Sequence, residues 1–280
     1  MVVPESIVYG LVLLSALAHA AWNAVVKHSA EGFLQLAMIR SVGLLIGILL
    51  ATQLPPPEPE AIGFLLGGAI FQYIYFFLLT RSYRVLDYGT AYPLARGVTP
   101  LLVALAALLF LDESLQPLQL TGVLLVSCGI LALLLKELQV SSPGILLSLG
   151  TGIAITGYTT LGAAGVRTVA NPLSFVAWLE ILSGAGILLA VLVTQPMRGI
   201  AFARTNLLRG SASGVLASGG FAVALWATSV MPVAAVAATR ETSILFASVI
   251  SVYVLNERFS ARRLIAALII FTGVGALAFA

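Results

Sequence analysis

A long segment of the sequence occurs twice, and this repeat constrains the fold more than any other feature. The segment 87–129 (DYGTAYPLARGVTPLLVALAALLFLDESLQPLQLTGVLLVSCG) returns as 231–273 (MPVAAVAATRETSILFASVISVYVLNERFSARRLIAALIIFTG). Three pairs of residues stay aligned without a gap, each 144 positions apart (240−96, 257−113, 273−129): Arg96 with Arg240, Glu113 with Glu257, and Gly129 with Gly273. Chance apolar similarity does not keep two charges and a glycine in one register, so the chain contains two copies of one unit.

Each copy consists of apolar runs that only lipid can solvate. The chain of 280 residues is 60% hydrophobic and 9% charged, with a mean hydropathy of +1.08, whereas a soluble domain carries about 25% charged residues. A helix needs about 20 apolar residues to cross a bilayer. Ten such spans are predicted: 6–27, 33–54, 61–81, 87–111, 115–136, 143–165, 172–194, 206–229, 232–255 and 260–280. We therefore predict an all-α integral membrane protein with ten transmembrane helices.

The ten predicted spans divide into two halves at the short segment 139–143 (QVSSP). The first repeat is predicted over 1–138 and the second over 142–280, with five helices in each. The connection is too short to separate them, so the halves are expected to pack as one domain. A unit with an odd number of spans comes out inverted in its second copy, which predicts two inverted five-helix repeats.

The basic residues gather in alternate loops, and this bias predicts the orientation. Odd-numbered loops carry most of them: Lys27, Arg81, Arg84, Lys136, Arg198, Arg204, Arg209, Arg258, Arg262 and Arg263. Even-numbered loops carry only Arg167, beside acidic residues. The positive-inside rule then puts the odd loops in the cytoplasm and both termini outside. The net charge of +3 and the pI near 9.2 reflect these loops and do not indicate nucleic-acid binding.

Five charged residues lie within the predicted spans, where an ionised side chain is costly and is by default a functional hypothesis. They are Arg40, Arg96, Glu180, Arg240 and Glu241. Arg40 and Glu180 occupy comparable places in spans two and seven, so a structural pair or helix caps at the repeat interface compete with a gating role. Arg240 and Glu241 are neighbours that do not share a helix face, so each needs another partner, and both roles stay open.

Arg96 is the charge that most favours function. Pro93 leaves a carbonyl unpaired in the preceding turn, and Gly97 allows close approach. A guanidinium group beside loosened backbone matches the two oxygens of a carboxylate. We predict that Arg96 engages a substrate carboxylate.

Aromatic and amide side chains form a second set of candidate residues. His19 and Asn23 are four positions apart and share a helix face, with Trp22 beside them. Such a wall suits a ligand with a flat apolar part and a polar end, although His19 also fits a packing role. Span three carries a further group: Gln72, Tyr73, Tyr75 and Phe76. The predicted substrate-binding residues are His19, Trp22, Asn23, Tyr73, Tyr92, Arg96, Tyr158 and Trp226.

Several motifs of other protein classes are missing from the sequence. It has no GxxxxGK[ST] loop of a nucleotide-driven pump, no HExxH pair and no cysteine–histidine cluster. We therefore expect neither an enzyme nor a cofactor or metal site. A ten-span chain with two pseudo-symmetric halves can contain a whole pathway, so a monomer is expected.

The repeat pattern resembles the EamA-type branch of the drug/metabolite transporter superfamily, over essentially the whole chain. The residues that carry this resemblance are the two LxE helix ends, Leu111-Asp112-Glu113 and Leu255-Asn256-Glu257, and Arg40 within LAMIRSVGLL. Within that branch the sequence is similar to the YddG-like exporters of aromatic and other amino acids. The resemblance implies export through a central cavity lined by spans one, three, four, six, eight and nine. Small multidrug-resistance relatives use a glutamate in span one for antiport, and span 6–27 has none.

The predicted function is export of amino acids, above all aromatic or hydrophobic ones, and of related small metabolites across a bacterial inner membrane by alternating access. The predicted partners are this small-molecule substrate and membrane lipid. One alternative is a carrier of another solute class, such as a drug, a nucleotide sugar or a phosphorylated metabolite. The other is a membrane receptor or enzyme that transports nothing.

Overall fold

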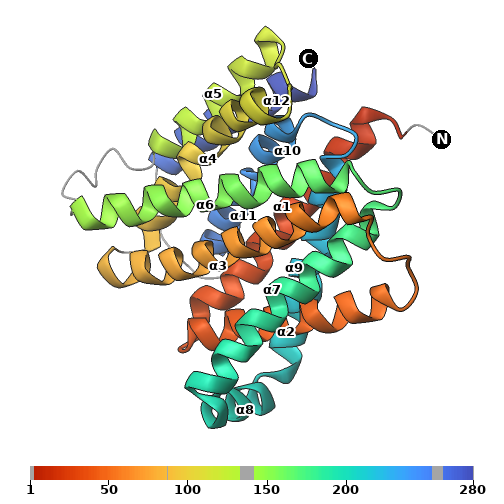
Figure 1. The fold of residues 1–280 in the computed structure, drawn as a ribbon. Helices are drawn as coiled ribbons and strands as arrows, with labels where there is room; N and C mark the ends of the chain where they lie inside the picture. Colours follow the sequence, from red (N-terminus) through yellow and green to blue (C-terminus); the bar gives the residue numbers. More distant parts are fainter. Residues whose placement is uncertain (1–2, 87, 133–141, 254–260, 280) are drawn as a thin grey trace.

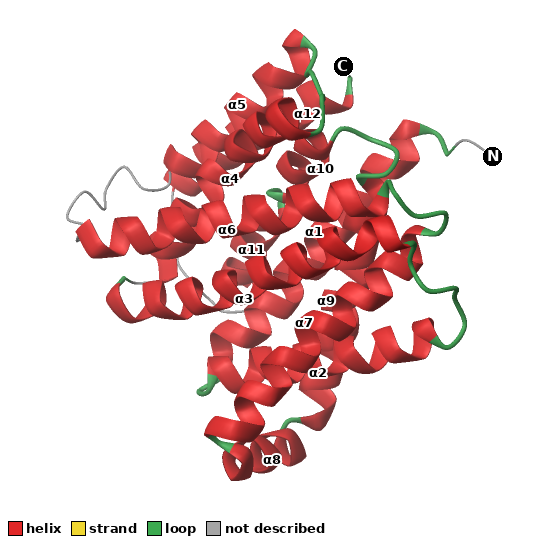
Figure 2. Ribbon diagram, in the orientation of Figure 1, coloured by secondary structure: helices red, strands yellow, loops and turns green. Residues whose placement is uncertain are grey.

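The protein is helical throughout the described part of the chain (Figures 1 and 2). The computed structural model describes residues 3–86, 88–132, 142–253 and 261–279. The first half contains α1 (Glu5–His28), α2 (Gly32–Ala51), the short η1 (Pro59–Ala61), α3 (Ile62–Val85), α4 (Tyr88–Phe110) and α5 (Pro117–Ala132). The second half contains α6 (Ser142–Val166), α7 (Pro172–Thr194), α8 (Pro196–Thr205), α9 (Leu207–Ala227), α10 (Val233–Arg240), α11 (Ser243–Tyr253) and α12 (Ala261–Ala278).

The helices follow the predicted spans closely, but not all of them reach full membrane length. Among the described residues, six segments are long and apolar enough to cross a membrane: 5–26, 32–51, 59–82, 142–166, 172–194 and 207–227. Three shorter apolar helices occupy 94–110, 117–132 and 264–278. The chain is therefore a multi-pass membrane protein, and the number of ten crossings stays a prediction.

The two halves pack on each other in a reciprocal way. The helix α3 packs on α6, and their counterparts α9 and α1 also pack together; α2 packs on its own counterpart α7, and α5 on α12. A Cβ added at Gly122 would lie 2.7 Å from the carbonyl oxygen of Gly273, and one added at Gly129 would lie 3.1 Å from that of Ala266. A shift of 144 positions turns one pair into the other (122+144 = 266, 273−144 = 129). The α5–α12 crossing thus has the reciprocity that a two-fold relation produces, and glycine is needed there because the backbones touch.

One predicted span is broken in the structure. The segment 232–255 was expected as a single helix, but it forms α10 and α11 with a break at Glu241 and Thr242. The N–H groups of Glu241 and Thr242 donate to residues three positions back, at 3.1 Å each, and the hydroxyl of Thr242 donates to the Thr239 carbonyl at 2.7 Å. That hydroxyl competes for a backbone acceptor and supports the tighter turn. The matching span α4 stays helical despite Pro93 and Pro100.

The helix α8 lies in a segment expected to be a basic loop. It is exposed along most of its length, and Phe202 packs against the cluster of Leu34, Ala37 and Val191. Arg198 on this helix pairs with Glu31 at 2.7 Å. The start of α1 and the end of α12 lie in the upper part of Figure 1, and α8 lies at the bottom.

Polar contacts join several connections at the end opposite α8, which we call the locked end. Arg167, after α6, forms an ion pair with Glu113, which follows α4. The same guanidinium donates to the Thr228 carbonyl at 2.7 and 2.8 Å. The second oxygen of Glu113 accepts from the N–H of Val233, the first residue of α10, at 2.9 Å. Connections from both halves are thereby held together.

Candidate functional site

Two adjoining cavities lie between the halves, near the break in α10 and α11. The aromatic cavity encloses about 570 Å3, part of it open to solvent, and is lined by His19, Trp22, Leu36, Ile39, Arg40, Gln72, Tyr75, Phe76, Tyr158, Ala217, Phe221 and Arg240. The polar cavity encloses about 480 Å3 and is lined by Arg96, Thr99, Ile155, Tyr158, Thr159, Phe221, Ala224, Leu225, Thr228, Val236, Ala237, Arg240 and Glu241. Three residues line both cavities: Tyr158, Phe221 and Arg240.

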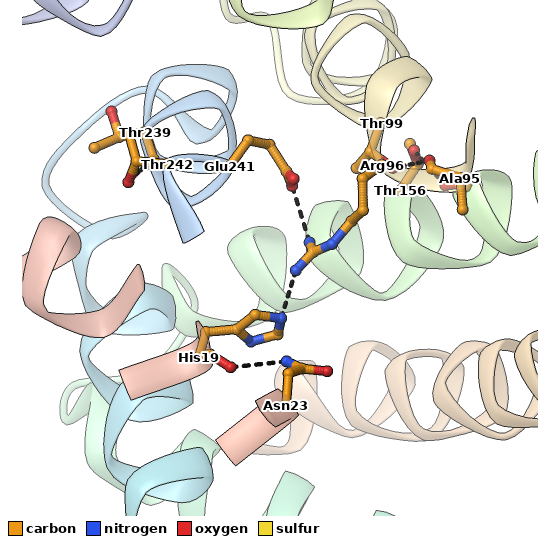
Figure 3. Close-up of polar contacts among 10 residues, drawn as sticks. His19, Asn23, Ala95, Arg96, Thr99, Thr156, Thr239, Glu241 and Thr242 are labelled. Carbon is orange, nitrogen blue, oxygen red and sulfur yellow. Dashed lines mark hydrogen bonds and ion pairs between the residues drawn. The ribbon is translucent and has the colours of Figure 1, made fainter. Parts of the chain in front are cut away.

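Arg96 stands at the centre of the polar network (Figure 3). Its Nη1 donates to Oε1 of Glu241 at 2.9 Å, and its Nη2 lies 2.5 Å from Nε2 of His19. Arg96 and Glu241 are almost fully buried, at 7% and 2% exposure. The network joins three elements, α1, α4 and the α10–α11 break, and so links the two halves of the chain. In this structure Arg96 therefore already holds one carboxylate, that of Glu241.

The carboxylate of Glu241 uses only one of its two oxygens. Within the described part of the chain, Oε2 is buried and accepts no hydrogen bond. A buried polar atom without a partner is costly, about 1–3 kcal/mol and more when charged. Glu241 also lines the polar cavity, so a ligand there could supply the missing donor.

Arg40 and Glu180 form a second buried ion pair across the halves, as the structural interpretation of these residues expected. Nη2 of Arg40 lies 3.1 Å from Oε2 of Glu180, without the alignment of a hydrogen bond. The guanidinium also donates to Gln72 at 3.3 Å and to Ser183. Gly43 and Gly184 allow the approach: a Cβ at Gly43 would overlap the Glu180 carboxylate, and one at Gly184 would lie 2.5 Å from the Arg40 carbonyl.

The structure brings together some of the predicted binding residues. His19, Trp22 and Tyr158 line the aromatic cavity, and the rings of His19 and Trp22 meet edge to face with centroids 4.8 Å apart. Arg96 and Tyr158 line the polar cavity.

Other predicted binding residues lie outside the lining. The Tyr73 hydroxyl donates to the Leu182 carbonyl and joins α3 to α7, Asn23 donates to the His19 carbonyl at 2.8 Å, and Trp226 packs against the hydrophobic core. For Tyr73 this follows from helix geometry, because it lies about 100° around α3 from Gln72, which does line the cavity. Asn23 shares a face with His19, but its amide bonds back to the backbone of its own helix. Tyr92 belongs to α4, but its side chain lies outside the described part of the structure.

Some lining residues were not among those predicted for the site. Gln72, Tyr75 and Phe76 had been noted on span three, and their spacing of three and four positions marks one helix face. Tyr75 reaches across to Tyr158, with ring centroids 5.8 Å apart. Phe221 lies on the apolar helix α9, five positions before Trp226, and nothing in its sequence context singles it out.

The charged side chains around the cavities determine which ligands the site suits. Three arginines, Arg40, Arg96 and Arg240, face two carboxylates, Glu180 and Glu241, so the two cavities and their direct partners carry a formal charge of +1. No group of three or more metal-ligating side chains occurs among the described residues. The arrangement suits reversible binding of an organic solute with an anionic group.

Comparison with known proteins gives a family and a fold. The model of the EamA-like transporter family matches residues 6–135 and again 142–279. A solved structure titled only "Crystal structure of protein" superposes with a TM-score of 0.71 at 18% identity, covering 96% of this chain and 94% of that one. At that identity the likeness shows the fold alone. No protein with a curated description matches the chain.

Proposed function

The chain belongs to the EamA-like transporter family, and we propose that within this family it exports amino acids, chiefly aromatic and hydrophobic ones. The family accounts for membrane transport of a small solute. The substrate, the outward direction, the bacterial inner membrane and the monomeric state are parts of the proposal.

The observation that carries the substrate proposal is the pairing of an aromatic cavity with a polar one. Rings of Trp22, Tyr75, Phe76, Tyr158 and Phe221 line space for an apolar side chain. Guanidinium groups of Arg96 and Arg240 stand beside it, and arginine is the side chain best shaped to bind a carboxylate. An aromatic amino acid presents both parts.

Arg96 keeps its proposed role as a receptor for the substrate carboxylate, with a condition that the structure adds. Its two terminal nitrogens contact Glu241 and His19, so a substrate carboxylate has to share or exchange these contacts. Arg240 is its repeat counterpart and lines both cavities. We place the carboxylate between these two arginines.

Alternating access is supported by two features of the fold. Contacts between the halves join the connections at the locked end, and we propose that they form a gate in one of its two states. Broken helices near the middle of the membrane are typical of transporter sites, where irregular backbone faces a cavity.

The experiment is counterflow of radiolabelled amino acids into liposomes that hold the purified full-length chain. Preloading with unlabelled phenylalanine should accelerate entry of labelled phenylalanine, with and without a proton gradient. If no amino acid exchanges, the substrate proposal is wrong, and nucleotide sugars, phosphorylated metabolites and drugs become the compounds to test.

A further inference from the structure

We propose that Glu241 is the receptor for the ammonium group of the substrate, so that the protein recognises a free α-amino acid by both of its charged ends. The inference rests on the proposed function and makes it narrower. In this proposal Oε2 of Glu241 accepts a hydrogen bond from the substrate, and the substrate must therefore carry a primary ammonium group.

The Glu241 carboxylate is held in one orientation and has one oxygen without a hydrogen-bond donor among the described residues. Arg96 holds Oε1 at 2.9 Å and so fixes the orientation of the group. Oε2 is buried and accepts no hydrogen bond within the described part of the chain. The residue is 2% exposed and lines the polar cavity. A donor arriving in that cavity removes an energetic cost that the empty site carries.

The charges that line the polar cavity favour a zwitterion over a ligand with one charge. Its charged lining residues are Arg96, Arg240 and Glu241, with a formal sum of +1. A zwitterion adds no net charge, and it pairs its carboxylate with the arginines and its ammonium with Glu241. An amine without a carboxylate raises the local charge to +2, and a carboxylate without an amine leaves Oε2 without a donor. Both fragments are therefore expected to bind more weakly than the amino acid.

The position of Glu241 in the fold also suits a binding role. It lies at the break between α10 and α11, where the backbone N–H groups of residues 241 and 242 bond three positions back. The hydroxyls of Thr239 and Ser243, on either side of the break, are also buried without hydrogen-bond partners among the described residues. The substrate side chain then extends past Tyr158 and Phe221, which both cavities share, toward the aromatic cavity.

A bare metal cation fits the same oxygen less well. Two guanidinium groups line the same cavity and repel it, and the described residues offer no cluster of three ligating side chains. An ammonium group that is joined to a carboxylate compensates this repulsion within one molecule.

The test compares three probes that share a phenyl ring: phenylalanine, phenethylamine and 3-phenylpropionate. Their binding to the purified full-length protein in detergent is measured by calorimetry, and their inhibition of phenylalanine counterflow is measured in liposomes. For the wild type we expect phenylalanine to bind at least about tenfold more tightly than either fragment, the range found when one partner of a buried charge pair is removed.

The variant Glu241→Gln separates the two ends of the ligand. It should weaken binding of phenylalanine and phenethylamine by about tenfold or more and leave 3-phenylpropionate unchanged or bound more tightly. Glu180→Gln is the matched control, because it also removes an ion-paired buried carboxylate but Glu180 lines neither cavity. In this control the ratio of amine to acid affinity should stay at the wild-type value.

The outcomes distinguish the inference from the function on which it rests. If phenylalanine exchanges but 3-phenylpropionate competes as well as phenylalanine, the ammonium receptor is overturned and amino-acid transport stands. The same holds if Glu241→Gln weakens all three probes equally. If Glu241→Gln does not fold, the three probes on the wild type and on Glu241→Asp decide. If no amino acid binds or exchanges, the proposed function fails and the inference fails with it.

Discussion

At the scale of single residues, buried ion pairs link the two halves of the chain. Each of two arginines in one half meets a carboxylate of the other half, Arg40 with Glu180 and Arg96 with Glu241. The two pairs differ in their surroundings. Among the described residues, both carboxylates have a buried oxygen that accepts no hydrogen bond. Glu241 lines the polar cavity, whereas Glu180 lines neither cavity and its partner Arg40 also donates to Gln72 and Ser183. The first pair fits a structural role and the second a binding role.

The Arg40 pair predicts a loss of stability on substitution. Arg40→Ala leaves Glu180 buried without its partner, and breaking a buried pair on one side costs about 3–5 kcal/mol. We expect a clear fall in the thermal unfolding midpoint in detergent. The double variant Arg40→Met/Glu180→Leu should recover much of this loss. Equal destabilisation by the single and double variants would show that the charges are not coupled.

We expect substitution of Arg96 to weaken substrate binding. Arg96→Lys keeps the charge but loses the planar fork that can hold Glu241 and a substrate carboxylate together. The KM for phenylalanine counterflow should rise about tenfold or more, and Arg96→Ala should be worse. Arg84→Ala, at the exposed end of α3, is the control and should leave KM unchanged. Unchanged transport in Arg96→Ala would show that Arg96 does not bind the substrate carboxylate.

At the scale of elements, most helices could be predicted from the sequence, whereas the break between α10 and α11 could not. Apolar runs indicate where a chain enters and leaves lipid. Every backbone N–H and C=O group within lipid needs a hydrogen bond, so the whole run has to be helical. At the break, the Thr242 hydroxyl and the N–H groups of residues 241 and 242 bond to carbonyls three positions back, and hydropathy does not register such short-range hydrogen bonds. Proline, the usual signal of a broken helix, lies in α4, which stays helical. In the same way, repeat spacing aligns Arg96 with Arg240 but could not show that Glu241 is the partner of Arg96.

Because Thr242 lies at the break between α10 and α11, we expect it to matter more for transport than for stability. Thr242→Ala removes the hydroxyl that donates to the Thr239 carbonyl and puts a strong helix former in its place. The segment should become more nearly one helix, so counterflow should slow severalfold while the unfolding midpoint stays level or rises. Thr151→Ala on α6 is the control, since its hydroxyl makes the same kind of bond, to the Leu147 carbonyl, away from both cavities. A fall in both transport and stability would assign Thr242 to packing.

At the scale of the whole molecule, the locked end shows how the two halves are coupled. Its contacts join the connection after α4 in one half to those after α6 and α9 in the other. The polar cavity reaches toward this end, because Thr228 both lines it and accepts from Arg167. Movement of the halves about a midplane site would have to break the Glu113–Arg167 pair before the cavity opens here.

Breaking that pair should therefore open the polar cavity at the locked end. The chain has a single cysteine, the exposed Cys128, which is first replaced by serine so that it does not react. Ala224→Cys then places a thiol in the lining of the polar cavity. Adding Arg167→Gln removes the ion pair with Glu113 and the bonds to the Thr228 carbonyl, and the population shifts toward the open state because only the closed state makes these contacts. A membrane-impermeant maleimide, applied to the locked-end side of oriented liposomes, should label the thiol severalfold faster than without this change. Arg198→Gln is the control, since it breaks the exposed pair with Glu31 near α8 and should leave labelling from the locked-end side unchanged. Equal labelling with and without Arg167→Gln would mean that these contacts hold the loops together but do not control access to the cavity.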